Sequence, residues 1–294
     1  MPDLKAFVGN FLIEGEEISH HGEGWVRDRL TFNCDGFTYV FIQSQKVLRS
    51  DGKRGSWEFV PSAVVCCENV NEDDFEKSLE VLNRLCWILT FATMSPVAVY
   101  GYEYPNGTGN GKFLDVAKNA RFHRPVFADG KQIKKFVSCV YETYKSLEHK
   151  RRLNGVIDYI NQADNLNQAI EVKLIILLVL MENIKHSFAE SKEIPFIDKH
   201  FRKRPKPQKG RDVFSFKELL DMMFCDAGMH IDLKPIVDLR NEIIHTGLTG
   251  EDYSWQRGHY EVIQDIIREY VLRIIGYNGG YFSYSSGGNK FLEI

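Results

Sequence analysis

The sequence predicts an α+β protein, in which a β-rich N-terminal domain precedes an all-α helical bundle. Short runs rich in Val, Ile, Phe, Tyr and Trp, separated by Gly, Asn and Asp, recur before residue 129. Longer segments with helical spacing of their apolar residues follow. The charge also changes, from 13 basic and 18 acidic residues in 1–129 to 24 basic and 22 acidic residues in 130–294. We therefore expect domains at 1–129 and 130–280 and a Gly/Ser/Tyr-rich tail at 281–294.

Five strands and one helix are expected in the first domain. The strand-like runs are Ala6–Ile13, Gly24–Phe32, Phe37–Ile42, Gly55–Val65 and Pro96–Tyr104. The helix covers Asp73–Thr93, because acidic residues crowd its first turn and leucines then recur at helical spacing. Asn71 is the expected cap of this helix. No known family suggests a role for this domain, and we expect it to sense a trigger, restrain activity or recruit substrate.

Six helices are expected in the second domain. They cover Lys131–Lys150, Leu153–Ile160, Gln168–Phe188, Ser215–Met223, Leu233–Thr246 and Trp255–Ile275. Ser215 suits a helix N-cap and Gly247 suits a helix end. Residues 191–213 are expected to form a long polar loop. In the tail, we expect Tyr281, Phe282 and Tyr284 to pack as a terminal strand rather than stack on bases.

The composition excludes several classes of protein. The chain is 44% hydrophobic and 26% charged, as in globular proteins, and its net charge of −3 is not that of a generally basic nucleic-acid binder. The longest apolar run, Leu174–Met181, is far shorter than the ~20 residues that cross a bilayer. The N-terminus lacks a secretory signal pattern, and none of the six cysteines forms a C-x-x-C pair. We expect a cytoplasmic protein with no metal and no cofactor.

The strongest local candidate for chemistry is the segment from Leu239 to His245. On a helix, Asn241 and His245 lie one turn apart, and the long side chain of Arg240 can reach the same region. The spacing by itself carries little weight, because most Arg and His side chains on helices are simply solvated. Glu182 in the apolar central helix can either pair with an arginine of the bundle, such as Arg240, or reach solvent.

Here the chain resembles the HEPN superfamily (higher eukaryotes and prokaryotes nucleotide-binding), particularly its ApeA-like branch. The resemblance is carried by Val237–Gly247, whose Arg240, Asn241 and His245 look like that family's motif. Phe216–Leu220 and Val271–Gly279 support it, so that it covers roughly residues 130–280. It implies a metal-independent endoribonuclease of a toxin-type, abortive-infection or other antiviral defence system, a homodimer formed through the motif helix, and in some systems an antitoxin or trigger protein as partner.

The resemblance implies a role for each residue of the motif. Histidine exchanges protons near neutrality and would serve the attack of a ribose 2′-hydroxyl on its own phosphate. Arginine offers a permanently charged fork for the developing charge on the phosphate. We therefore assign His245 to proton transfer, Arg240 to charge stabilisation and Asn241 to orientation. RNA, including tRNA, would be cut to 2′,3′-cyclic phosphate and 5′-hydroxyl ends, and DNA would survive.

A basic segment interrupts the same domain. Residues 199–211 hold seven Lys or Arg residues in thirteen positions, a composition that can follow a phosphate backbone. The expected RNA contacts are Arg202, Lys203, Arg204, Lys206, Lys209 and Arg211. The alternative for this segment is a solvated loop without a partner.

Two other functions stay open from the sequence. The first is a non-catalytic HEPN-like module for dimerisation and for binding RNA or nucleotide, in which Arg240 forms a structural ion pair with Glu182 or Asp238. The second is a metabolic enzyme in the β-rich half, which ranks last because that half shows no nucleophile, metal set or cofactor motif. A metal site at His20, His21 and Glu23 is not expected, because the sequence offers no further ligand at a spacing typical of metal sites.

Overall fold

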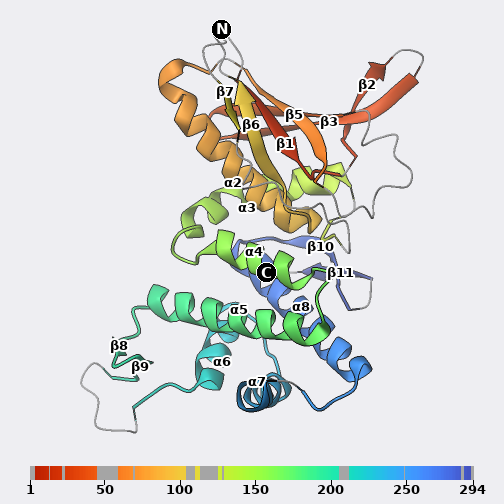
Figure 1. Cartoon of the computed structure of the whole chain (residues 1–294). Coiled ribbons are helices and arrows are strands. Elements are labelled where there is room, and N and C mark those ends of the chain that lie inside the picture. Colours follow the sequence, from red (N-terminus) through yellow and green to blue (C-terminus); the bar gives the residue numbers. More distant parts are fainter. Residues whose placement is uncertain are drawn as a thin grey trace. The chain divides into compact units, whose positions relative to one another are not determined.

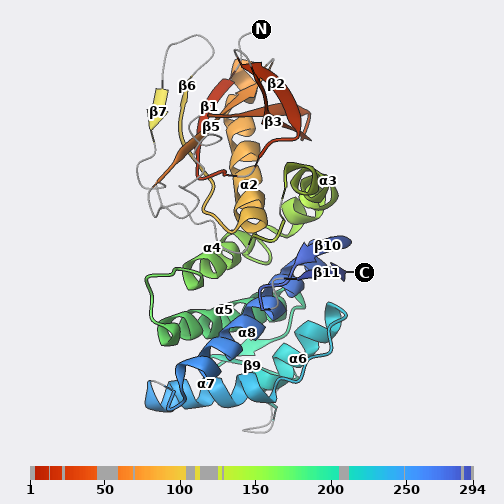
Figure 2. The same cartoon turned by 90° about the vertical axis from the view of Figure 1, so that its right-hand side faces the viewer.

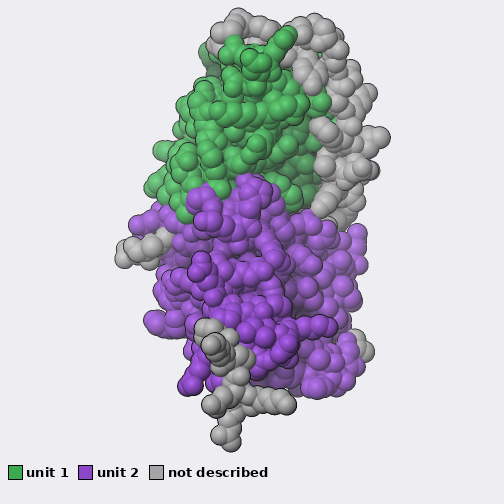
Figure 3. Space-filling view, turned by 90° about the vertical axis from the view of Figure 1, so that its left-hand side faces the viewer, with its two compact units in different colours: residues 1–145, 280–282, 287–290 green, residues 146–279, 283–286, 291–294 purple. Residues whose placement is uncertain are grey.

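The fold class is confirmed: an antiparallel sheet fills the N-terminal half and helices fill the C-terminal half. The computed structural model describes residues 4–12, 14–21, 24–44, 59–68, 70–103, 110–112, 125–127, 129–204, 212–247, 249–285 and 288–292. The chain divides into two compact units (Figure 3). The first comprises 1–145 with 280–282 and 287–290, and the second comprises 146–279 with 283–286 and 291–294.

The first unit is built on a seven-stranded sheet with the order β2-β3-β4-β5-β1-β6-β7. Its strands are β1 (Leu4–Gly9), β2 (Glu17–His21), β3 (Gly24–Cys34), β4 (Phe37–Gln43), β5 (Pro61–Cys67), β6 (Ala98–Glu103) and β7 (Asn110–Lys112). Every neighbouring pair is antiparallel. The five expected strands are present, with shifted ends. β2 and β7 were not expected, because neither has the run of apolar residues by which a strand is recognised.

One face of this sheet is covered by α2 (Phe75–Thr93), which follows the 3-10 turn η1 (Glu72–Asp74) (Figure 1). Alternate residues of the strands are buried, as in Leu30 and Phe32 of β3. The Tyr39 hydroxyl of β4 donates a hydrogen bond of 2.8 Å to the Ser78 carbonyl of α2. Asn71 precedes η1 and makes no side-chain capping bond. The predicted helix therefore exists, but its expected cap does not act as one.

The first unit extends beyond the boundary expected at residue 129. It includes most of α3 (Gly130–Leu147), which the sequence assigned to the helical domain. The ring of Phe136 lies 4.5 Å from that of Phe127 and 6.2 Å from that of Phe91 on α2, measured between centroids. An apolar stripe predicts that a helix packs, but it does not say against which neighbour, so this boundary could not be placed from periodicity.

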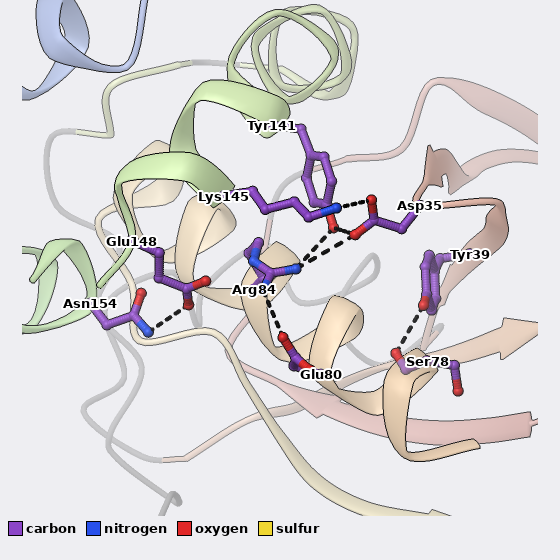
Figure 4. Close-up of polar contacts among 9 residues, drawn as sticks. All are labelled: Asp35, Tyr39, Ser78, Glu80, Arg84, Tyr141, Lys145, Glu148 and Asn154. Carbon is purple, nitrogen blue, oxygen red and sulfur yellow. Dashed lines mark hydrogen bonds and ion pairs between the residues drawn. The ribbon is translucent and has the colours of Figure 1, made fainter. Parts of the chain in front are cut away.

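Ion pairs fix the turn between β3 and β4 to the helices of the first unit (Figure 4). The carboxylate of Asp35 accepts a 2.8 Å hydrogen bond from the Tyr141 hydroxyl, pairs with Arg84 at 3.6 Å, and also pairs with Lys145. Burial raises the pKa of Asp35, but the bonds from Lys145 and Tyr141 and the nearby positive charges outweigh it and hold the pKa below its ordinary value. The turn is therefore anchored through a charged carboxylate.

The second unit is helical, and α5 lies at its centre (Figures 1 and 2). Its helices are α4 (Leu153–Ala163), α5 (Ile170–Ser191), α6 (Phe216–Asp226), α7 (Lys234–Thr246) and α8 (Tyr253–Ile274). α5 packs against α4, α6 and α8. Leu174, Leu177, Met181 and Ile184 of α5 are buried, as the apolar run predicted. No helix in the described part of the chain is both long and apolar enough to cross a bilayer.

The predicted helix ends at Ser215 and Gly247 are confirmed. Ser215 and Glu218 form a reciprocal capping box at the start of α6, and Gly247 ends α7 with a φ of 78°. The expected polar loop at 191–213 is not entirely irregular, because it contains the short strands β8 (Phe196–Ile197) and β9 (His200–Phe201).

The tail forms strands: Tyr281 and Phe282 lie in a strand, as expected, whereas Tyr284 lies in the turn that follows it. β10 (Gly279–Phe282) pairs with β11 (Asn289–Leu292), and Tyr281 is buried. Tyr284 is also buried, and its hydroxyl donates a hydrogen bond of 2.5 Å to the carboxylate of Asp164 at the end of α4. The tyrosines of the tail are therefore part of the core.

Candidate functional site

The helix α7 presents the candidate motif on its solvent side. Ile236, Leu239 and Ile243 recur every three or four residues and are buried. Asn241 and His245 lie on the exposed side, and Arg240 is partly buried at the edge between them and the core. The apolar stripe that holds α7 against the bundle therefore fixes which way the polar side chains of the motif face.

The guanidinium of Arg240 is held by two neighbouring helices. Its Nε and Nη2 donate hydrogen bonds of 3.1 and 2.9 Å to Oε1 of Glu182 on α5. Its Cζ also lies 4.7 Å from the ring centroid of Phe216, the first residue of α6. The side chains of Arg240 and Glu182 are 27% and 38% exposed, so the ion pair lies at the surface rather than in a dry core.

A second cation completes this cluster. Lys185 on α5 donates to Oε2 of Glu182, and its Nζ lies 5.0 Å from the centroid of Phe216. The ring of Phe216 thus contacts both the Arg240 guanidinium and the Lys185 ammonium, and one carboxylate serves two cations. The cluster of Glu182, Lys185, Phe216 and Arg240 is therefore positive by one charge, and it suits an anionic ligand.

Within the motif, the structure joins Arg240 to Asn241 but not to His245. Nη1 of Arg240 donates a hydrogen bond of 3.2 Å to Oδ1 of Asn241. His245 is exposed one turn beyond Asn241. In the described part of the chain Arg240 and His245 share no hydrogen bond, since five positions place them about 140° apart around a helix.

The alternatives left open for Glu182 and for Arg240 are resolved. Glu182 pairs with Arg240 instead of reaching only solvent. Asp238, the other proposed partner of Arg240, binds Lys234 at 2.5 Å. Two residues of the cluster, Lys185 and Phe216, were not identified as site residues from the sequence. Phe216 lies in a segment that supported the family resemblance, but only its contact with two cations reveals its role.

The described cations of the basic segment differ in whether they pair with a carboxylate. Arg202 lies 3.6 Å from the carboxylate of Asp198, and Lys203 pairs with Glu218. That bond and the Ser215 cap lower the pKa of Glu218 to about 2. Arg204 is exposed. The other three expected RNA contacts, Lys206, Lys209 and Arg211, lie outside the described residues.

Two points remain: whether the site can hold a metal ion, and whether known proteins resemble the chain. Among the described residues, no group of three or more His, Cys, Asp or Glu side chains could hold a metal ion. The arrangement around Arg240 offers hydrogen-bond donors, a positive charge and an exposed imidazole one turn from Asn241. No protein-family model, curated protein or solved structure matches the chain, so a function for this site rests on its own residues and geometry.

Proposed function

We propose that the helical unit is a metal-independent endoribonuclease of a defence system, and that it cuts RNA through attack of a 2′-hydroxyl on the adjacent phosphate. The observation that carries the proposal is the held but accessible guanidinium of Arg240. Glu182 and Phe216 restrict its movement while leaving it 27% exposed. Stabilisation of a developing phosphorane charge requires preorganised donors, and the exposed part of the guanidinium lets a substrate reach them.

The donors of Arg240 suffice for this role. A guanidinium has five N–H groups, and the bonds to Glu182 and Asn241 use three of them. One N–H on each terminal nitrogen is left for a phosphate, which matches the bidentate geometry that arginine uses with such anions. Asn241 then orients the guanidinium, and Glu182 sets its position from α5.

His245 supplies proton transfer in this proposal. An exposed imidazole can take the proton of the 2′-hydroxyl or give one to the leaving 5′-oxygen. One α7 provides a single motif histidine, so the acid and the base come from two copies of the chain, in a homodimer formed through α7. The products are a 2′,3′-cyclic phosphate and a 5′-hydroxyl.

The decisive experiment is to sequence RNA 5′-hydroxyl ends after expression of the wild type and of His245→Ala. In parallel, the purified proteins are incubated with total RNA and tRNA in EDTA. His149→Ala, which removes another exposed histidine of the same unit, is the matched control. New ends in the wild type and the control, and none in His245→Ala, are expected. Cleavage that persists in His245→Ala refutes the proposal.

The ion pair between Arg240 and Glu182 also supports a second function, in which the role of the pair is structural. If Arg240 only braces α7 against α5, the unit is a non-catalytic module for dimerisation and RNA binding. Arg240→Ala would then lower the melting temperature and leave RNA ends unchanged at every temperature at which the variant is folded. If the unit is an enzyme, Arg240→Lys, which keeps the positive charge, instead loses cleavage while the variant stays folded.

A further inference from the structure

A half-exposed phenylalanine stands on the hairpin that follows α5. Phe196 of β8 and Phe201 of β9 face each other with their ring centroids 4.8 Å apart. His186 of α5 contacts both rings, at 5.3 and 4.9 Å. Phe201 is buried against Ala189 of α5 and Leu219 of α6. Phe196 is nevertheless 52% exposed, so its ring is held by two aromatic neighbours and still offers surface to solvent.

The backbone of this hairpin adopts an unfavourable conformation. Its two turn residues, Asp198 and Lys199, have φ values of 50° and 64°. A two-residue turn of this kind needs positive φ at both positions and is usually made with Asn-Gly or Asp-Gly, so Asp198 suits the first position and Lys199 is strained at the second. The hairpin is closed by a 2.8 Å hydrogen bond from the Arg202 amide to the Pro195 carbonyl.

The charge beside the ring selects the kind of partner. Residues 199–211 contain seven Lys or Arg residues and no Asp or Glu. Lys199 and Arg204 are exposed next to the hairpin. Apolar surface alone would suit many partners, but an exposed ring that is near the exposed cations Lys199 and Arg204 in the chain suits a polyanion with planar groups. Single-stranded nucleic acid has this composition, and it binds by base stacking on aromatic rings combined with phosphate contacts.

The platform and the proposed catalytic arginine both contact α5. His186, which contacts Phe196, follows Glu182 by one turn of α5, a rise of about 6 Å. Glu182 in turn holds Arg240. The platform and the Arg240 cluster are therefore both held by the same stretch of α5.

We infer that Phe196 is a stacking platform for an unpaired base of single-stranded RNA, and that Lys199 and Arg204 bind its phosphates. The inference rests on the proposed function in that RNA is the substrate. It adds a specificity: the enzyme takes single-stranded rather than fully paired RNA, because a paired base is not free to stack on a protein ring.

The test measures binding separately from cleavage. All proteins carry His245→Ala, and affinity for a fluorescein-labelled single-stranded oligoadenylate is measured by fluorescence anisotropy. Phe196→Leu, which keeps an apolar side chain without an aromatic face, is expected to weaken binding roughly tenfold. Phe196→Tyr is expected to bind like the parent protein. The control is Val262→Ala on α8, which shortens a side chain that is equally exposed, at 51%.

Polyphosphate, which has charge but no bases, distinguishes stacking from electrostatics. Phe196→Leu is expected to bind polyphosphate as tightly as the parent. Unchanged oligoadenylate binding in Phe196→Leu overturns the inference, and so does an equal loss for both polyanions. If His245→Ala leaves RNA cleavage intact but Phe196→Leu loses oligoadenylate, the nuclease proposal fails while the platform stands. If His245→Ala abolishes RNA cleavage but Phe196→Leu still binds oligoadenylate, the nuclease proposal stands and the platform is refuted.

Discussion

Replacing Asp164 with Asn is expected to destabilise the helical unit by about 3 kcal/mol. The carboxylate is 1% exposed, and its Oδ1 accepts hydrogen bonds from the hydroxyls of Tyr260, at 3.0 Å, and Tyr284. Fully buried Arg268 lies in the same cluster, with its Cζ 4.6 Å from the centroid of Tyr284. Burial lowers the pKa of Arg268, and the negative charges of Asp164 and Asp265 oppose that shift.

The size of the effect follows from which interaction is lost. An Asn side chain still accepts hydrogen bonds from the two tyrosines, so the loss comes from the missing charge opposite Arg268. A buried charge that loses a nearby opposite charge typically costs about 3–5 kcal/mol. The low end applies because the carboxylate of Asp265 continues to stabilise Arg268. At about 2–4 °C per kcal/mol, the melting temperature should fall by roughly 6–12 °C.

Urea unfolding followed by circular dichroism measures this change, and a thermal scan checks it. Asp221→Asn on α6 neutralises an exposed carboxylate of the same unit and should change the stability by less than about 0.5 kcal/mol. A loss below about 1 kcal/mol in Asp164→Asn would refute the reasoning, because the buried guanidinium would then not depend on that charge.

Three further predictions follow from other parts of the chain. The pKa of Asp35 is lowered in the folded protein, so this carboxylate contributes its full stability above its unfolded pKa of about 4. That contribution is lost as the pH falls through the lower folded pKa. The urea midpoint should therefore vary less between about pH 2 and 6 in Asp35→Asn than in the wild type. Ser215→Ala removes the capping box of α6 and should cost about 1 kcal/mol in urea unfolding, whereas Ser215→Asp, which keeps a capping oxygen, should cost less. Under the proposed function, Arg240→Lys should reduce single-turnover RNA cleavage about 100-fold or more, because an ammonium cannot bond Glu182, Asn241 and a phosphate together; cleavage within a few-fold of the wild type would show that the guanidinium is dispensable.

Much of the secondary structure could be predicted, because its signals are local. The capping box at Ser215 and the left-handed Gly247 depend on residues within one turn of the helix end, and both are confirmed. The strand β2 was missed because its sequence, Glu17–His21, is mostly polar, and it exists through pairing with β3. The hairpin β8–β9 was missed for a related reason, since its turn lacks the usual Asn-Gly pair.

The candidate site was predicted in part. The sequence placed Arg240, Asn241 and His245 on one helix, and that helix is confirmed. It left open whether Glu182 pairs with Arg240 or reaches solvent, and the structure shows the ion pair. RNA cleavage and the membership of the HEPN superfamily stay predictions. Phe216 and Phe196 could not be found from spacing, because the contacts of Phe216 with two cations and the exposure of Phe196 in a hairpin are known only from the tertiary structure.

The sequence alone determined the α+β class, the helices and most strands, because periodicity and capping act over one or two turns of backbone. Only the tertiary structure decided that α3 belongs with the sheet, that Tyr284 bonds Asp164, which lies 120 positions away, and that Glu182 pairs with an arginine 58 positions away. These arrangements depend on which apolar surfaces meet when the chain collapses. An amphipathic pattern states that a face must be buried but leaves its partner unspecified.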